Sequence, residues 1–206
     1  MDNMDYLNKI SAKPAPTNDN RLFSPLMIKI LIGAAAVLVL VIALGAITSS
    51  ANSRNATLYQ TFYLRLKNLS DEKGPIAVYS RNIQSSELRA IAGTLKSSLA
   101  GTAREFSPIL ADDLKIDLKK LDPKVIDSET DHLIQFASTL QNAKLNGLLD
   151  RTFGSATALQ ISLILTMGSE ILERNPSDNT KTLIDKFITD LQILHAQFVQ
   201  FNSSSN

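Results

Sequence analysis

The sequence LIDKFITDLQILHAQFVQF, residues 183–201, carries the most regular hydrophobic pattern of the chain. Its large apolar side chains recur every three or four residues, which is the spacing of one face of an α-helix. Pro176 and Ser177 precede the pattern and are typical of a helix start. The segment therefore predicts a long amphipathic helix with one face buried in a helical core. That face consists of Leu183, Ile184, Phe187, Leu191, Leu194, Phe198 and Phe201.

Four earlier segments repeat this pattern less regularly. We expect helices over residues 54–72, 75–106, 128–151 and 155–174, with a kink or fresh start at Ser85 and Ser86 and a break or kink at Phe153 and Gly154. Residues 128–131 resemble a capping box, so they are expected to begin the third helix after a long connection over 107–127. Alternating apolar runs bounded by turn dipeptides are absent. The chain is therefore predicted to be all-α, with an antiparallel bundle of about four to five helices over residues 55–202.

A second decisive stretch is ILIGAAAVLVLVIALGAIT, residues 30–48, which is 19 residues long and contains no charge. About 20 apolar residues in a helix cross the hydrocarbon core of a bilayer. Ser24 and Pro25 predict a helix start, so we place one transmembrane helix at residues 26–48. A buried soluble helix fits poorly because no face of the segment is polar. A cleaved signal peptide is the stronger alternative, but the apolar core is longer than such segments usually are.

The basic residues around this segment predict its orientation. Lys9, Lys13, Arg21 and Lys29 lie at or before its start, whereas Arg54 is the first basic residue after it. The excess on the N-terminal side favours an N-terminus inside the cell. The sequence thus predicts a single-pass signal-anchor protein of the cell membrane. It would have a short polar cytoplasmic tail (1–25), a linker (49–54), an extracytoplasmic bundle and a disordered tail (203–206).

Composition excludes several classes of function. The chain has no cysteine, which excludes disulfides, thiolate nucleophiles and zinc–thiolate sites. It also has no tryptophan, and only 6% of its residues are aromatic, which argues against an extended base-stacking surface. Residues 49–206 contain 17 basic and 17 acidic side chains and are formally neutral. Because nucleic-acid binding requires a basic surplus, no nucleic-acid partner is predicted.

No constellation of residues predicts catalysis. His132 and His195 lie outside any metal-binding motif, and Glu170 and Glu173 share a helix face that is expected to be solvated. Nucleophile elbows and phosphate-binding glycine loops are absent from the sequence. We therefore predict no catalytic, cofactor-binding or metal-binding residues, no cofactor, and a protein that is not an enzyme.

Three tyrosines, Tyr59, Tyr63 and Tyr79, are the candidates for an interaction face. Aromatic residues with a polar tip are favoured in interfaces. They are equally typical of the edge of a helical core, so the sequence supports both interpretations.

The function expected from these features is a non-catalytic envelope interaction or scaffold module with a protein partner and one membrane span. A first alternative is a bundle that senses or carries a small apolar ligand, since helical bundles hold ligands between their helices. The cavity would then be lined by Leu95, Leu163, Met167 and Phe187. A second alternative is a carboxylate-metal or hydrolytic enzyme.

Overall fold

The structure is a computed structural model that describes residues 51–112 and 114–204. The described residues all belong to one compact unit, Ser50–Asn206. The predicted transmembrane helix at 26–48 and the cytoplasmic tail lie outside the described residues. The prediction of a membrane anchor therefore stays a prediction.

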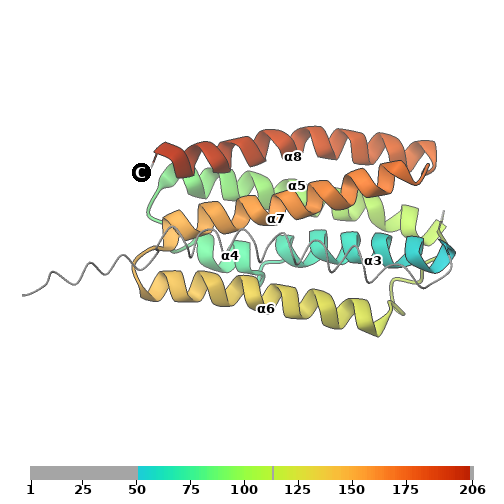
Figure 1. Cartoon of the computed structure of the whole chain (residues 1–206), viewed down its shortest axis with the longest axis horizontal. Coiled ribbons are helices and arrows are strands. Elements are labelled where there is room, and N and C mark those ends of the chain that lie inside the picture. The colour runs from blue at the N-terminus through green and yellow to red at the C-terminus, as the bar shows by residue number, and fades with distance from the viewer. Residues whose placement is uncertain (1–50, 113, 205–206) are drawn as a thin grey trace, which may run out of the picture. The chain divides into compact units, whose positions relative to one another are not determined.

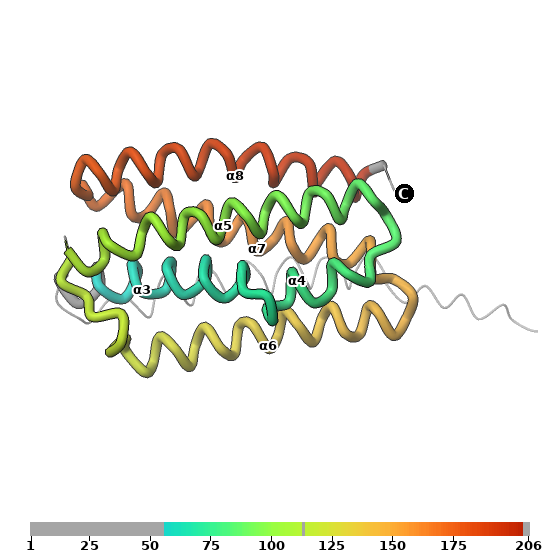
Figure 2. Tube along the Cα trace, turned by 180° about the vertical axis from the view of Figure 1, so that it is seen from behind, coloured from blue at the N-terminus to red at the C-terminus, as the bar shows by residue number. Residues whose placement is uncertain are grey.

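The described residues are helical, with no strand among them. The helices are α3 (Ala51–Ser70), α4 (Pro75–Ser80), α5 (Ser86–Asp112), α6 (Pro123–Leu145), α7 (Leu149–Glu173) and α8 (Asp178–Ser204). The short α4 continues the line of α3, and each following long helix reverses direction (Figures 1 and 2). The predicted all-α antiparallel bundle is thus confirmed for this part of the chain, with five long helices.

Helix α3 lies at the centre of the bundle. It packs against α5, α6 and α7, while α8 covers α5 and α7 from the other side. Four aromatic side chains join α3 to α5 and α8. The ring centroids are 5.2 Å apart for Phe62 and Phe106, 6.0 Å for Tyr59 and Phe106, and 6.0 Å for Phe62 and Phe187. Edge-to-face and stacked rings at these distances contribute beyond the burial of their surface.

A buried ion pair joins α3 to α6. Arg65 Nε lies 2.5 Å from Glu129 Oε2, and Arg65 Nη2 lies 2.6 Å from Glu129 Oε1. The two side chains are only 8% and 3% exposed. Two charges withdrawn from water this completely require each other, because either one alone would be a buried unpaired charge. The pair therefore fixes the register of α6 against α3.

Polar side chains fix the ends of the helices. The Asp122 side chain accepts a hydrogen bond from the Lys124 backbone amide, and Pro123 follows as the first residue of α6. The Asp150 carboxylate of α7 accepts hydrogen bonds from the backbone amides of Gln84 and Ser85, just before α5. Gly147, with φ of 70°, provides the left-handed turn between α6 and α7.

The predicted boundaries before and within α6 are wrong. Helix α5 continues through Pro108 to Asp112, so much of the predicted connection over 107–127 is helical. Helix α6 starts at Pro123, which places the supposed capping box inside the helix. Glu129, a member of that box, is the buried partner of Arg65. The tertiary ion pair of Glu129 thus lies within the segment that was expected to begin the helix.

Other predicted boundaries shift as well. Phe153 and Gly154 lie within α7 and do not break it. A Cβ at Gly154 would meet the end of the Asn202 side chain of α8, so a larger residue there requires that side chain to move. Helix α3 already begins at Ala51, within the predicted linker, and α8 runs to Ser204, into the predicted disordered tail.

Among the described residues, α7 alone is long and apolar enough for a membrane span when judged by length and composition. Core helices of soluble bundles meet the same criteria. Here α7 packs against α3, α6 and α8 and buries Phe153, Ile161 and Ile164 among them.

We predict that Arg65→Met and Glu129→Leu will each lower the free energy of unfolding by about 3–5 kcal/mol, because each leaves one buried charge unpaired. The double variant Arg65→Met/Glu129→Leu should lose less than either single variant, since no charge remains buried. Denaturant unfolding of all three variants measures this coupling.

Glu170→Leu is the matched control. Glu170 pairs with Arg174 at the exposed end of α7, so its loss should cost no more than about 1 kcal/mol. If the losses at positions 65 and 129 simply add in the double variant, the pair is not the coupled contact that we describe.

Candidate interaction groove

The three candidate tyrosines do not form one face. Tyr59 is 3% exposed and stacks on Phe106, so it belongs to the core, and burial raises the pKa of its hydroxyl. Tyr63 is half-buried and faces α5. The Tyr79 hydroxyl donates a hydrogen bond of 3.1 Å to Gln141 on α6. Only Tyr63 therefore lines a surface hollow next to charged side chains.

The four residues of the predicted apolar cavity lie at different depths in the bundle. Leu95 and Phe187 are buried in the main hydrophobic core, and Leu163 and Met167 are half-buried. None of the four lines either of the two surface hollows described below. The packing of Leu95 and Phe187 into the core accounts for their apolar character without a ligand.

His132 belongs to the polar contacts around the buried ion pair. Its Nε2 lies 2.6 Å from Oε1 of Gln160 on α7, and because a carbonyl oxygen only accepts, Nε2 carries the proton. Burial, and next the positive charge of Arg65, lower the pKa of His132. The imidazole is therefore neutral near pH 7 and links α6 to α7.

His195 contacts a serine, but the geometry does not resemble a nucleophile and its base. Its Nε2 lies 2.9 Å from Ser162 Oγ, and the same Oγ donates to the backbone carbonyl of Ala158 at 3.1 Å. The Ser162 hydroxyl therefore has a backbone acceptor in its own helix besides the imidazole. Both residues lie mid-helix, where backbone amides are engaged within the helix and cannot stabilise an oxyanion. The part of the chain that the structure describes contains no group of three or more potential metal ligands.

The charges of the bundle are unevenly distributed along the chain, although its total is neutral. Residues 51–107 contain eight basic and four acidic side chains, whereas residues 108–206 contain nine basic and thirteen acidic ones. The first hairpin is thus positive and the remainder negative. Because the two excesses cancel, residues 49–206 are neutral as a whole. The basic side chains of the first hairpin are Arg54, Arg65, Lys67, Lys73, Arg81, Arg89, Lys96 and Arg104.

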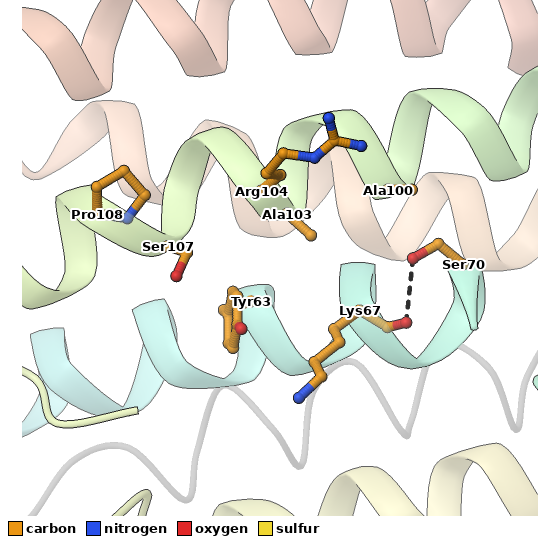
Figure 3. Close-up of a pocket in the computed structure, with 8 residues that line it drawn as sticks. All are labelled: Tyr63, Lys67, Ser70, Ala100, Ala103, Arg104, Ser107 and Pro108. Carbon is orange, nitrogen blue, oxygen red and sulfur yellow. Dashed lines mark hydrogen bonds between the residues drawn. The ribbon is translucent and has the colours of Figure 1, made fainter. Parts of the chain in front are cut away.

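A surface hollow of about 330 Å³ lies between α3 and α5 (Figure 3). Small side chains, among them Ala100, Ala103 and Ser107, form much of its α5 side. Lys67 on α3 and Arg104 on α5 are exposed, and their charged ends extend away from each other on opposite sides of the hollow (Figure 3). Of the small residues between them, Ala100 and Ser107 are half-buried and Ala103 is buried.

A second hollow of about 230 Å³ lies between α4 and α5. It is lined by Arg81, Arg89 and Lys96 and by one acidic residue, Glu72. Since Lys96 and Ala100 are one helical turn apart, the two hollows follow each other along α5. We call the two hollows together the α3–α5 groove.

The Glu72 carboxylate is an anion of the chain itself that two basic side chains of the groove bind. Lys96 Nζ lies 2.5 Å from its Oε1, and Arg81 Nη2 lies 3.7 Å from its Oε2. The hydrogen bond and then the charge of Lys96 lower the pKa of Glu72. The two cations are therefore placed to share one carboxylate at the mouth of the groove, while Lys67, Arg89 and Arg104 line the rest of it.

Two glycines on α5 have no role in the packing of the described bundle. A Cβ at Gly93 or Gly101 would meet no atom within 4 Å. Glycine inside a helix lowers stability by about 0.5–1 kcal/mol relative to alanine. At these two positions neither a close contact nor a positive φ requires glycine. Gly93 lines the groove, so the α5 backbone is open to close approach at that position.

No family model, no curated protein and no solved structure matches this chain. The candidate site therefore rests on the geometry and charge of the α3–α5 groove.

The His132 environment predicts how stability depends on pH. Because its pKa is lower in the folded chain than the value of about 6.5 in an unfolded chain, the unfolded state binds the proton first. Its contribution to stability is present above that value and is lost as the pH falls. We predict that His132→Gln reduces the fall in melting temperature between about pH 7.5 and pH 5.5.

His195→Gln is the control, as the other histidine of the chain. Thermal unfolding of the parent and both variants across this pH range measures the difference. An equal fall in the parent and in His132→Gln would show that His132 does not carry the pH dependence.

Proposed function

We propose that this chain is a membrane-tethered, non-catalytic interaction module. In this proposal its bundle lies outside the cytoplasm and contacts a partner protein through the α3–α5 groove. The observation that carries the proposal is the groove itself, an open surface with a small-residue floor and an excess of basic side chains. Such a surface gives shape and charge for recognition but brings together no groups that could perform a reaction.

Three further features support a binding role over the alternatives. The Ser162 hydroxyl that contacts His195 lies mid-helix and is also within hydrogen-bond distance of the backbone carbonyl of Ala158. The described residues lack a metal-ligand cluster. The residues predicted to line an apolar cavity are core residues or half-buried helix residues. The tether and the outward orientation come from the apolar segment at 30–48 and the basic residues that precede it.

The absence of cysteine allows a direct test of the orientation. Single variants Ser203→Cys and Ser11→Cys are labelled in intact cells with a thiol reagent that does not cross membranes. We predict that position 203 reacts and that position 11 reacts only after the cells are opened. Labelling of position 11 alone in intact cells would place the bundle in the cytoplasm and contradict the proposed location.

The groove is tested in the same cells by replacing Ala100 with a photoreactive amino acid. We predict a cross-linked protein adduct from position 100, which lies in the groove. The matched control is the same replacement at Gln192, an exposed position on α8, which should give no such adduct. An adduct from position 192 alone would move the interaction surface to another face of the bundle.

A further inference from the structure

We infer that the α3–α5 groove binds an acidic amphipathic helix of the partner protein. This inference rests on the proposed function, because it names the chemistry of the partner at the same surface. It is carried by the length of the groove, the positions of its basic side chains and the carboxylate already bound at its mouth.

The dimensions of the groove suit a helix. Its residues on α5 run from Arg89 to Pro108, a rise of about 28 Å at 1.5 Å per residue. Gly93 is exposed and Ala100 is half-buried, and both offer little side-chain volume, so a partner helix can approach the backbone of α5 closely at these two positions. A ridge of small or apolar side chains on the partner would fill the floor.

The positions of the basic side chains repeat along the groove. Arg89, Lys96 and Arg104 are seven and eight residues apart, so they recur every two turns along one side of α5. On the other side of the groove, Lys67 lies on α3 and Arg81 directly after α4. A helix with acidic side chains at two-turn intervals matches this pattern, because its carboxylates would lie beside successive cations.

Glu72 acts in this arrangement as an internal substitute for a partner carboxylate. It is the acidic residue that lines the groove, and it pairs with both Lys96 and Arg81. Its side chain is 73% exposed, so it is free to move aside. A partner carboxylate can take its place between the same two cations, and Glu72 would then compete with the partner.

The same observations favour a protein helix over an anionic membrane surface. Proteins that bind membrane surfaces insert large apolar side chains beside their basic residues. Among the described residues, the large exposed apolar side chains lie on α6, α7 and α8 and in the α6–α7 turn, with the exception of Val78.

The test uses the full chain in nanodiscs of phosphatidylcholine and a fluorescent peptide of about 20 residues, the length that spans the groove. The peptide carries glutamates along one helical face and alanines and leucines along the other. We expect it to bind with an affinity that falls as salt increases, and we expect a matched peptide with lysine at each glutamate not to bind. Fluorescence anisotropy measures both.

Charge reversal locates the binding site. Lys67→Glu/Arg104→Glu should weaken peptide binding by about tenfold or more, while Glu72→Gln should strengthen it several-fold by removing the internal competitor. Lys144→Glu/Lys186→Glu makes the same change in net charge at exposed positions on α6 and α8 and should have little effect. Unchanged melting temperatures confirm that each variant is folded.

The inference is overturned if the acidic peptide does not bind, or if the two double variants weaken binding equally. It is also overturned if phosphatidylglycerol vesicles, and not the peptide, are bound in a manner that depends on Lys67 and Arg104. A cross-link from position 100 in cells, together with no binding of the acidic peptide, would refute the inference and leave the proposed function in place.

Discussion

The contact between Arg65 and Glu129 is the constraint on which the arrangement of the bundle depends. Both charges are almost fully buried, so neither can be accommodated without the other. Their pairing holds α6 against α3, and α3 is also packed against α5 and α7. The contact between His132 and Gln160 then extends the polar connection from α6 to α7. Three of the five long helices are thereby held in one register.

The same contact decides which side of α3 faces outward. Arg65 and Lys67 are two residues apart, so their side chains leave the helix on nearly opposite sides. With Arg65 turned towards α6, Lys67 and Tyr63 are turned towards α5 and line the groove. The pairing of the buried Arg65 with Glu129 thus places the basic side chain of Lys67 on the surface that we propose for recognition. Residues of α5 supply three further basic side chains of the groove, Arg89, Lys96 and Arg104.

Much of the fold could be predicted from the sequence, because amphipathic periodicity is a local property. The stripe over 183–201 correctly predicted α8, and the scarcity of strand patterns correctly predicted an all-helical domain. The errors occurred where tertiary contacts override local signals. Residues 128–131 resemble a helix start, but Glu129 is required inside α6 by Arg65, a residue 64 positions earlier.

The candidate site was harder to predict for a related reason. The division of charge between residues 51–107 and 108–206 is visible in the sequence, but a count over the whole domain conceals it. That Lys67 and Arg104 lie on the two sides of one groove, whereas Tyr59 is stacked in the core, follows only from how α3 and α5 pack. Glu72, Lys96 and Arg81 likewise come together only in the folded chain.

The most direct measurement of the central claim is the reactivity of individual lysines towards an acylating reagent, quantified by mass spectrometry. It would compare the protein in native membranes with the purified full chain. If the α3–α5 groove is the occupied surface, Lys67 and Lys96 will be protected in native membranes and reactive after purification. Lys144 and Lys186, on α6 and α8, will react equally in both states. Equal reactivity of Lys67 and Lys96 in the two states would contradict the claim that this groove holds a partner.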